Sequence, residues 1–132
     1  MDKHRDLGLL ILRVGMGAMF VSHGLPKLLG GVARWESLGR AMQHLGIDFA
    51  PVFWGFMAGF AETVGGIALA AGLAFRPACA LLTFTMLVAV TKHFAQGDDF
   101  ARASHAIEAG ILFVSLFLIG PGAWRLRLQR GG

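Results

Sequence analysis

Eight ionisable side chains lie within or at the ends of the apolar segments of this 132-residue chain. They are Arg13, His23, Lys27, Glu62, Lys92, His93, His105 and Glu108. Histidine, lysine and arginine can donate hydrogen bonds to a carbonyl oxygen, and a carboxylate can relay protons. We therefore predict a polar ligand-binding site that can exchange protons, provided that the fold brings these side chains together. Which of them is catalytic stays open.

The first apolar segment, residues 7–29, contains three of these groups: Arg13, His23 and Lys27. A segment of about 20 apolar residues spans a bilayer, and ionisable groups inside it are expensive and functional candidates. Because two helical turns cover about 7.2 residues, Arg13, Phe20 and Lys27 lie close to one line. That face is predicted to point at other helices or at a wet cavity rather than at lipid.

Composition indicates an integral membrane protein. Hydrophobic residues make up 55% of the chain and charged residues only 15%, with a mean hydropathy of +0.62. The net charge of +4 does not indicate nucleic acid, because no basic stripe is interleaved with exposed aromatics. Cys79 is the sole cysteine, which excludes a disulfide or a C-x-x-C motif within the chain. The first apolar run is too long for a typical signal peptide, which favours an uncleaved helix.

We expect one all-α domain over residues 1–132, folded as an integral membrane four-helix bundle. The predicted spans are about 7–29, 52–75, 78–94 and 101–119, with a short interfacial helix at about 32–46 between spans one and two. Pro26 predicts a kink or break near the end of the first span, and Arg76-Pro77 a tight turn. The interfacial segment has a second interpretation, a surface helix packed over the mouth of the bundle.

Four spans place both chain ends on one side of the membrane. Basic residues are more numerous on that side, and they are Lys3, Arg5, Arg76, Arg125, Arg127 and Arg130. The positive-inside rule then predicts that both termini are cytoplasmic.

Helical depth predicts where the eight groups meet. Six of them fall in the outer part of their spans: His23, Lys27, Lys92, His93, His105 and Glu108. Glu62 lies deeper. Arg13 lies deeper still, within about two turns of Glu62, so the two are expected to be able to pair. Each group also has a structural interpretation: a buried ion pair, a lysine reaching the interface, or a helix cap. A metal site from His23, His93, His105 and Glu108 is disfavoured by the nearby lysines.

These residues resemble the DoxX family of small four-helix membrane proteins. The resemblance rests on Arg13…Gly17…Phe20…His23-Gly24-x-x-Lys27, Glu62-x-x-Gly65-Gly66 with Gly72-Leu73 and Arg76, Lys92-His93-Phe94, Glu108, and Gly120-Pro121-Gly122. The tail, with Trp124, Arg125 and Arg127, departs from the Ser and Asp that relatives often carry. The resemblance implies a bacterial inner-membrane protein associated with redox processes, with relatives that include components of quinone-linked oxidoreductases and a partner of oxidative-stress enzymes.

Two functions stay open at this point. In the first, the polar site binds a quinone headgroup or similar small redox ligand in a cavity open to the outer face. No haem or flavin motif is present, so the cofactor is unassigned and electrons must come from the ligand or a partner subunit. In the second, the chain is a noncatalytic subunit that anchors a partner oxidoreductase. The lipid bilayer is an expected partner and nucleic acid is not; a homo-oligomer stays open.

Overall fold

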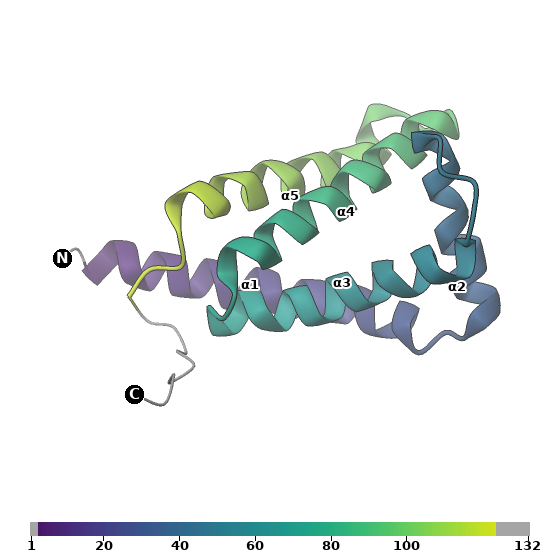
Figure 1. The fold of residues 1–132 in the computed structure, drawn as a ribbon. Helices are drawn as coiled ribbons and strands as arrows, with labels where there is room; N and C mark the ends of the chain where they lie inside the picture. The colour runs from purple at the N-terminus through teal and green to yellow at the C-terminus, as the bar shows by residue number, and fades with distance from the viewer. Residues whose placement is uncertain (1–2, 124–132) are drawn as a thin grey trace.

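The computed structural model describes residues 3–123, and every regular element within them is helical (Figure 1). The elements are α1 (Lys3–Leu28), α2 (Val32–Gly39), the 3-10 helix η1 (Arg40–Leu45), α3 (Pro51–Ala71), α4 (Phe75–Ala95) and α5 (Phe100–Ile119). Across this described range, four helices (α1, α3, α4 and α5) are long and apolar enough to cross a membrane. The predicted all-α, four-span architecture is confirmed. The tail residues Trp124, Arg125, Arg127 and Arg130 lie outside the described residues.

The four long helices form two antiparallel pairs, α1 with α3 and α4 with α5 (Figure 1). The pairs are joined where α3 packs on α4, whereas the Cα atoms of α1 and α5 approach nowhere within 8 Å. Lys3 and Ala123 lie at one end of the bundle, here called the terminal end, and α2 with η1 covers the other, the α2 end (Figure 1). The bundle is therefore less closely packed on its α1–α5 side.

Glycines let α1 and α3 approach closely. A Cβ atom at Gly17 would overlap the carbonyl oxygen of Gly66, and one at Gly24 would overlap Glu62 and the backbone of Thr63. Small residues of this kind allow helices to pack closely inside a bilayer. These contacts fix the register of the two helices, and they place Glu62 beside the half of α1 that is nearer the α2 end.

The connection from α3 to α4 differs from the prediction. Helix α3 ends at Ala71 because Gly72, with φ 74°, adopts the left-handed conformation that closes a helix. Helix α4 then begins at Phe75, so Arg76-Pro77 lies in its first turn and forms no separate turn. Proline is tolerated there since the first turn has no intrahelical partner for its missing N–H. The predicted break at Pro26 is also absent, because α1 is continuous through that residue.

The segment between α1 and α3 forms two short helices that pack over the α2 end. A Cβ atom at Gly55 would overlap the backbone of Trp35, so α2 crosses α3 at close range. The Trp35 indole Nε1 donates to the carbonyl oxygen of Lys27 at 3.0 Å, and its ring packs edge-on against Phe56. The segment therefore packs on the end of the bundle, as its second interpretation expects, and its position in the membrane interface stays a prediction.

The apolar core fills the terminal half of the bundle. Its most buried side chains come from α3, α4 and α5 and are Leu69, Cys79, Leu82, Phe113 and Leu116. At its boundary the Phe20 and Phe113 rings meet edge to face, with centroids 4.9 Å apart. Phe20 also lines the cavity in the other half of the bundle, so this ring pair forms its floor.

Candidate functional site

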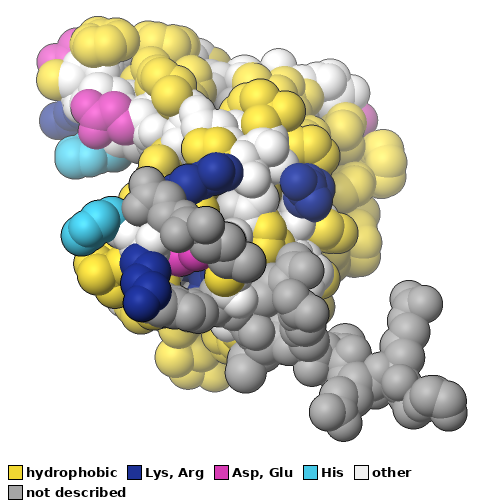
Figure 2. Space-filling view, turned by 90° about the vertical axis from the view of Figure 1, so that its left-hand side faces the viewer, with side chains coloured by type: hydrophobic (Ala, Val, Ile, Leu, Met, Phe, Trp, Pro, Cys, Tyr) yellow, Lys and Arg dark blue, Asp and Glu magenta, His cyan; other side chains and the backbone are white. Residues whose placement is uncertain are grey.

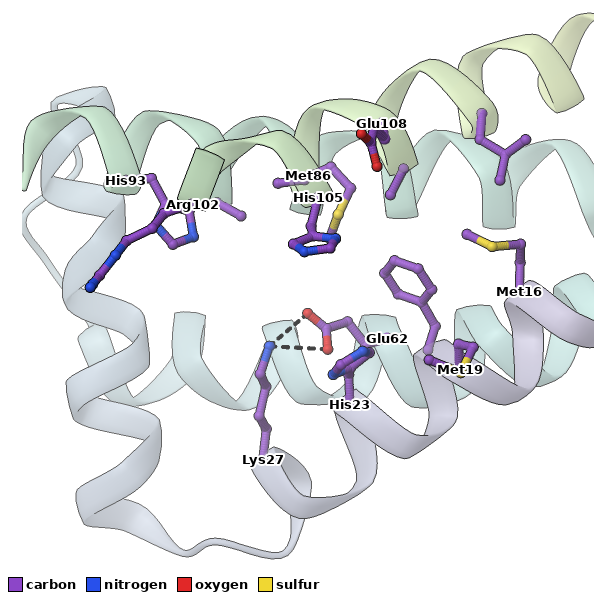
Figure 3. Close-up of a pocket in the computed structure, with 15 residues that line it drawn as sticks. Met16, Met19, His23, Lys27, Glu62, Met86, His93, Arg102, His105 and Glu108 are labelled. Atoms are coloured by element: carbon purple, nitrogen blue, oxygen red, sulfur yellow. Dashed lines mark hydrogen bonds and ion pairs between the residues drawn. The ribbon is translucent and has the colours of Figure 1, made fainter. Parts of the chain in front are cut away.

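A cavity of about 480 Å³ lies between the two helix pairs in the α2 half of the bundle (Figure 3). Six of the eight ionisable residues singled out in the sequence line it: His23, Lys27, Glu62, His93, His105 and Glu108. They come from α1, α3, α4 and α5, so all four long helices contribute. Since no Cα atoms of α1 and α5 lie within 8 Å of each other, and the Phe20 and Phe113 rings bridge these helices only at the floor, we place the mouth of the cavity between them.

Lys27 and Glu62 form the central ion pair of this cavity (Figure 3). The Lys27 ammonium donates to both carboxylate oxygens of Glu62, at 2.8 and 3.1 Å. Glu62 is almost fully buried, with 4% of its side chain exposed, and Lys27 retains 26% exposure toward the cavity. A buried carboxylate is tolerated when a paired cation and good geometry offset the loss of its hydration.

His93 is held by an acidic partner, Asp98, in the loop between α4 and α5. Its Nδ1 lies 2.8 Å from Oδ2 of Asp98, whose other oxygen is 3.8 Å from the guanidinium of Arg102. Since an ionised carboxylate only accepts hydrogen bonds, the imidazole Nδ1–H donates in this contact. The other ring nitrogen of His93 is left for the cavity, as in other histidines oriented by a carboxylate.

Three further cavity residues have no hydrogen-bond partner among residues 3–123. His23 and His105 lie on opposite sides of the cavity, and Glu108 follows His105 by one turn of α5 (Figure 3). All three side chains are exposed, and none takes part in a hydrogen bond or ion pair with the described residues. His23 makes only an edge contact with the Phe20 ring. Their polar atoms are therefore available to a ligand.

Two of the eight predicted residues lie elsewhere. The Arg13 side chain, 1% exposed, donates to the carbonyl oxygens of Pro121 at 2.6 Å and Ala70 at 3.4 Å. The expected pair with Glu62 does not form, because Arg13 lies level with Ala70, which is eight residues or about 12 Å farther along α3. Lys92 lines a separate cavity between α3 and α4.

Sequence reasoning missed two polar residues of the site. Arg102 lines the cavity, and Asp98 orients His93 from its edge. A signal for Arg102 existed in the sequence, since it precedes His105 by three residues and so shares its helix face. Asp98 gave no such signal, because its approach to His93 depends on how the loop folds back. Methionines Met16, Met19 and Met86 supply adaptable apolar walls.

Among residues 3–123, no three histidine, cysteine, aspartate or glutamate side chains gather closely enough to hold a metal ion. A space wide enough for an organic molecule instead lies between the four residues that the sequence offered as metal ligands, which are His23, His93, His105 and Glu108.

The chain was compared with known proteins. The DoxX family model matches residues 8–95. The chain is 31% identical over 90 residues to "Putative oxidoreductase CatD" of Bacillus subtilis, a match that covers 68% of this chain and 62% of that protein. It is 29% identical over 130 residues to "Inner membrane protein YqjF" of Escherichia coli, covering 96% of this chain and 94% of the relative. No solved structure matches the chain.

The family match covers the first three spans and most of the cavity, including His23, Lys27, Glu62 and His93. The YqjF match extends over nearly the whole chain and thus includes α5. With four helices able to span a bilayer and an inner-membrane relative, the chain is a bacterial membrane protein. Because the family model matches more than half of its length, the chain belongs to the DoxX family.

Proposed function

We propose that the protein binds the headgroup of a quinone, or of a similar small redox molecule, in the cavity between α1 and α5. One observation carries the proposal: four helices bring seven ionisable side chains to a single cavity of about 480 Å³. Ligand pockets in proteins have volumes of about 300–1,000 Å³ and combine apolar walls with a few convergent polar groups. The redox character is supported by a relative named as an oxidoreductase.

The donor set fits the chemistry of a quinone. A quinone carries two carbonyl oxygens on opposite sides of its ring, and each needs a hydrogen-bond donor. His23 and His105 lie on opposite sides of the cavity and have no hydrogen-bond partner in the described chain (Figure 3). Reduction to the quinol takes up two electrons and two protons, and a histidine ring can both accept and donate protons.

The protein's own side chains provide the proton path but not the electrons. Glu108 lies one turn from His105 and is exposed, so it can carry protons between the cavity and its mouth. The sequence contains no haem or flavin motif and one cysteine. The two electrons are therefore assigned to a partner oxidoreductase subunit, which binds this protein in the membrane.

Both termini are assigned to the cytoplasm, so the cavity lies in the outer half of the membrane. Exposed Lys3, Arg5 and Arg76 gather at the terminal end, where Figure 2 shows several basic side chains. Basic residues near span ends favour the cytoplasmic side. We assign the protein to the bacterial inner membrane on the same grounds.

One observation favours the second function, a noncatalytic subunit that anchors a partner complex. The Lys27–Glu62 pair is tight and well formed, as expected of a structural ion pair. In that case substitutions in the cavity would lower stability and would have no effect on any ligand.

The test is quinone binding by the purified protein in detergent, with two variants that leave packing intact. His105→Ala and Glu108→Gln are suitable because both side chains are exposed and make no hydrogen bond within the described chain. We expect His105→Ala to weaken binding by about tenfold, the effect of one lost hydrogen bond, and Glu108→Gln to change it by less than about twofold, because an ionised carboxylate donates no hydrogen bond to a quinone carbonyl.

Matched controls are available outside the cavity. His44→Ala changes an exposed histidine of η1, and Glu36→Gln changes an exposed carboxylate of α2. Neither should alter the dissociation constant. Absence of saturable binding in the wild type, with normal thermal melting, would contradict the ligand function and favour the anchoring subunit.

A further inference from the structure

A second cavity of about 400 Å³ lies on the other side of the Lys27–Glu62 pair, between α3, α4 and η1. The two cavities share four lining residues: Lys27, Glu62, Ala89 and His93. The remaining walls of the second cavity are mostly apolar, and they include Met42, Met57, Ala58, Phe84 and Val88. A cavity lined by many ionisable side chains therefore adjoins, at one ion pair, a cavity whose remaining walls are apolar except for Thr85, Lys92 and Gln96.

We propose that the second cavity binds the hydrocarbon chain of the molecule whose headgroup occupies the first. The ligand class is then a quinone with a long prenyl or alkyl chain, rather than a chainless, water-soluble quinone. This inference rests on the proposed function, and it adds that the ligand carries a hydrocarbon chain attached to its headgroup.

The shared lining residues favour a single ligand that extends through both cavities. The shared residue Ala89 carries only a methyl group, so α4 leaves room next to the Lys27–Glu62 pair. A headgroup beside the ion pair in the first cavity is then within reach of the apolar walls. Interiors of proteins are close-packed, so an apolar space of this volume is more than a packing defect.

The chain also has a way into the bilayer. Phe84 lines the second cavity and yet is 46% exposed on the outer surface of α4. It therefore stands at the rim of the cavity, where the end of a long chain can continue into lipid. Lateral entry of this kind suits a ligand that is dissolved in the membrane.

The experiment compares two benzoquinones that differ only in one substituent, a decyl chain or a methyl group. Binding is measured for the full-length protein in lipid nanodiscs, for the wild type and two Ala→Leu variants. Ala58→Leu narrows the second cavity alone, whereas Ala80→Leu adds the same atoms to an exposed face of α4. The decyl quinone partitions into the nanodisc lipid equally for both variants. This partitioning therefore cancels when their apparent affinities are compared.

We expect Ala58→Leu to weaken binding of the decyl quinone by about tenfold and to change that of the methyl quinone by less than twofold. Ala80→Leu should change neither. If Ala58→Leu does not fold, Val88→Phe narrows the same cavity from α4, with Leu87→Phe on the exposed face as its control.

Three results would overturn the inference, and they can be distinguished. If Ala58→Leu weakens the binding of both quinones equally, the second cavity does not distinguish the decyl chain from the methyl group. The proposed headgroup site in the first cavity would be unaffected by this result. Ala58→Leu could also leave the binding of both quinones unchanged. If native mass spectrometry then finds phospholipid on the wild type but not on Ala58→Leu, the cavity binds a lipid chain. If neither quinone binds the wild type, the proposed function itself fails.

Discussion

The Lys27 ammonium lies 2.8 Å from Oε1 of Glu62, and this pair of side chains lines both cavities of the bundle. The two residues are 35 positions apart in the chain and belong to α1 and α3. Their contact depends on the close approach of these helices, which Gly24 permits by lying against Glu62 and Thr63. The pair thus combines a structural contact with a position at the centre of the candidate site.

A double-mutant cycle measures how much this pair stabilises the fold. Lys27→Met should lower the free energy of unfolding by about 3–5 kcal/mol, because it leaves the buried Glu62 carboxylate without its partner, whereas Glu62→Gln should lower it by less because Lys27 is partly exposed. The double variant should recover much of that loss, since no unpaired charge remains. Chemical unfolding in detergent gives the values.

The control for this cycle is the exposed pair of Glu36 and Arg40 on α2 and η1. Glu36→Gln should change the free energy of unfolding by no more than about 1 kcal/mol, as for most exposed ion pairs. If the losses of the two single variants simply add in the double variant, the residues do not interact.

The packing of α1 on α3 predicts opposite effects of one substitution at two glycines of α1. Gly24→Ala places a methyl group against the backbone of Thr63 and should cost about 1–3 kcal/mol. Gly15→Ala meets no atom within 4 Å and should be neutral or stabilise by up to about 1 kcal/mol, because alanine favours helix. Thermal melting of the two variants provides the comparison; equal melting temperatures would argue against this packing.

Asp98 should control the tautomer of His93. While Asp98 accepts from Nδ1, the neutral ring carries its proton there. Asp98→Ala removes the acceptor, and the proton should move to the other ring nitrogen in most molecules. Nitrogen-15 NMR of the histidine side chains reports this change directly. Asp48→Ala, at an exposed loop position, is the control, and an unchanged His93 spectrum in Asp98→Ala would exclude the contact.

The proposed topology predicts which ends of the bundle a membrane-impermeant maleimide can reach. Cys79 is buried and is the sole cysteine, so a Cys79→Ser background allows single cysteines to be introduced. Asp48→Cys lies near the α2 end and should be labelled in intact spheroplasts. Ala123→Cys lies at the terminal end and should react only after lysis. The reverse pattern would mean that the cavity faces the cytoplasm.

The sequence by itself determined the four helices and most of the site. Spans of about 20 apolar residues with few charges leave the backbone no alternative to helix in a bilayer. Turn-forming residues mark several of their ends, as Gly120 does after Ile119. Because helical depth follows from residue number alone, His23, His93 and His105 could be assigned to one level, where the cavity now contains all three.

Only the tertiary structure decided which groups pair and where the cavity opens. Glu62 binds Lys27 rather than Arg13 because the Gly17 and Gly24 contacts set the register of α1 against α3, which spacing within one helix does not reveal. Asp98 reaches His93 through the fold of a loop. The α1–α5 mouth likewise depends on the wide backbone separation of two helices far apart in sequence, and such long-range arrangements leave no periodic signal in the chain.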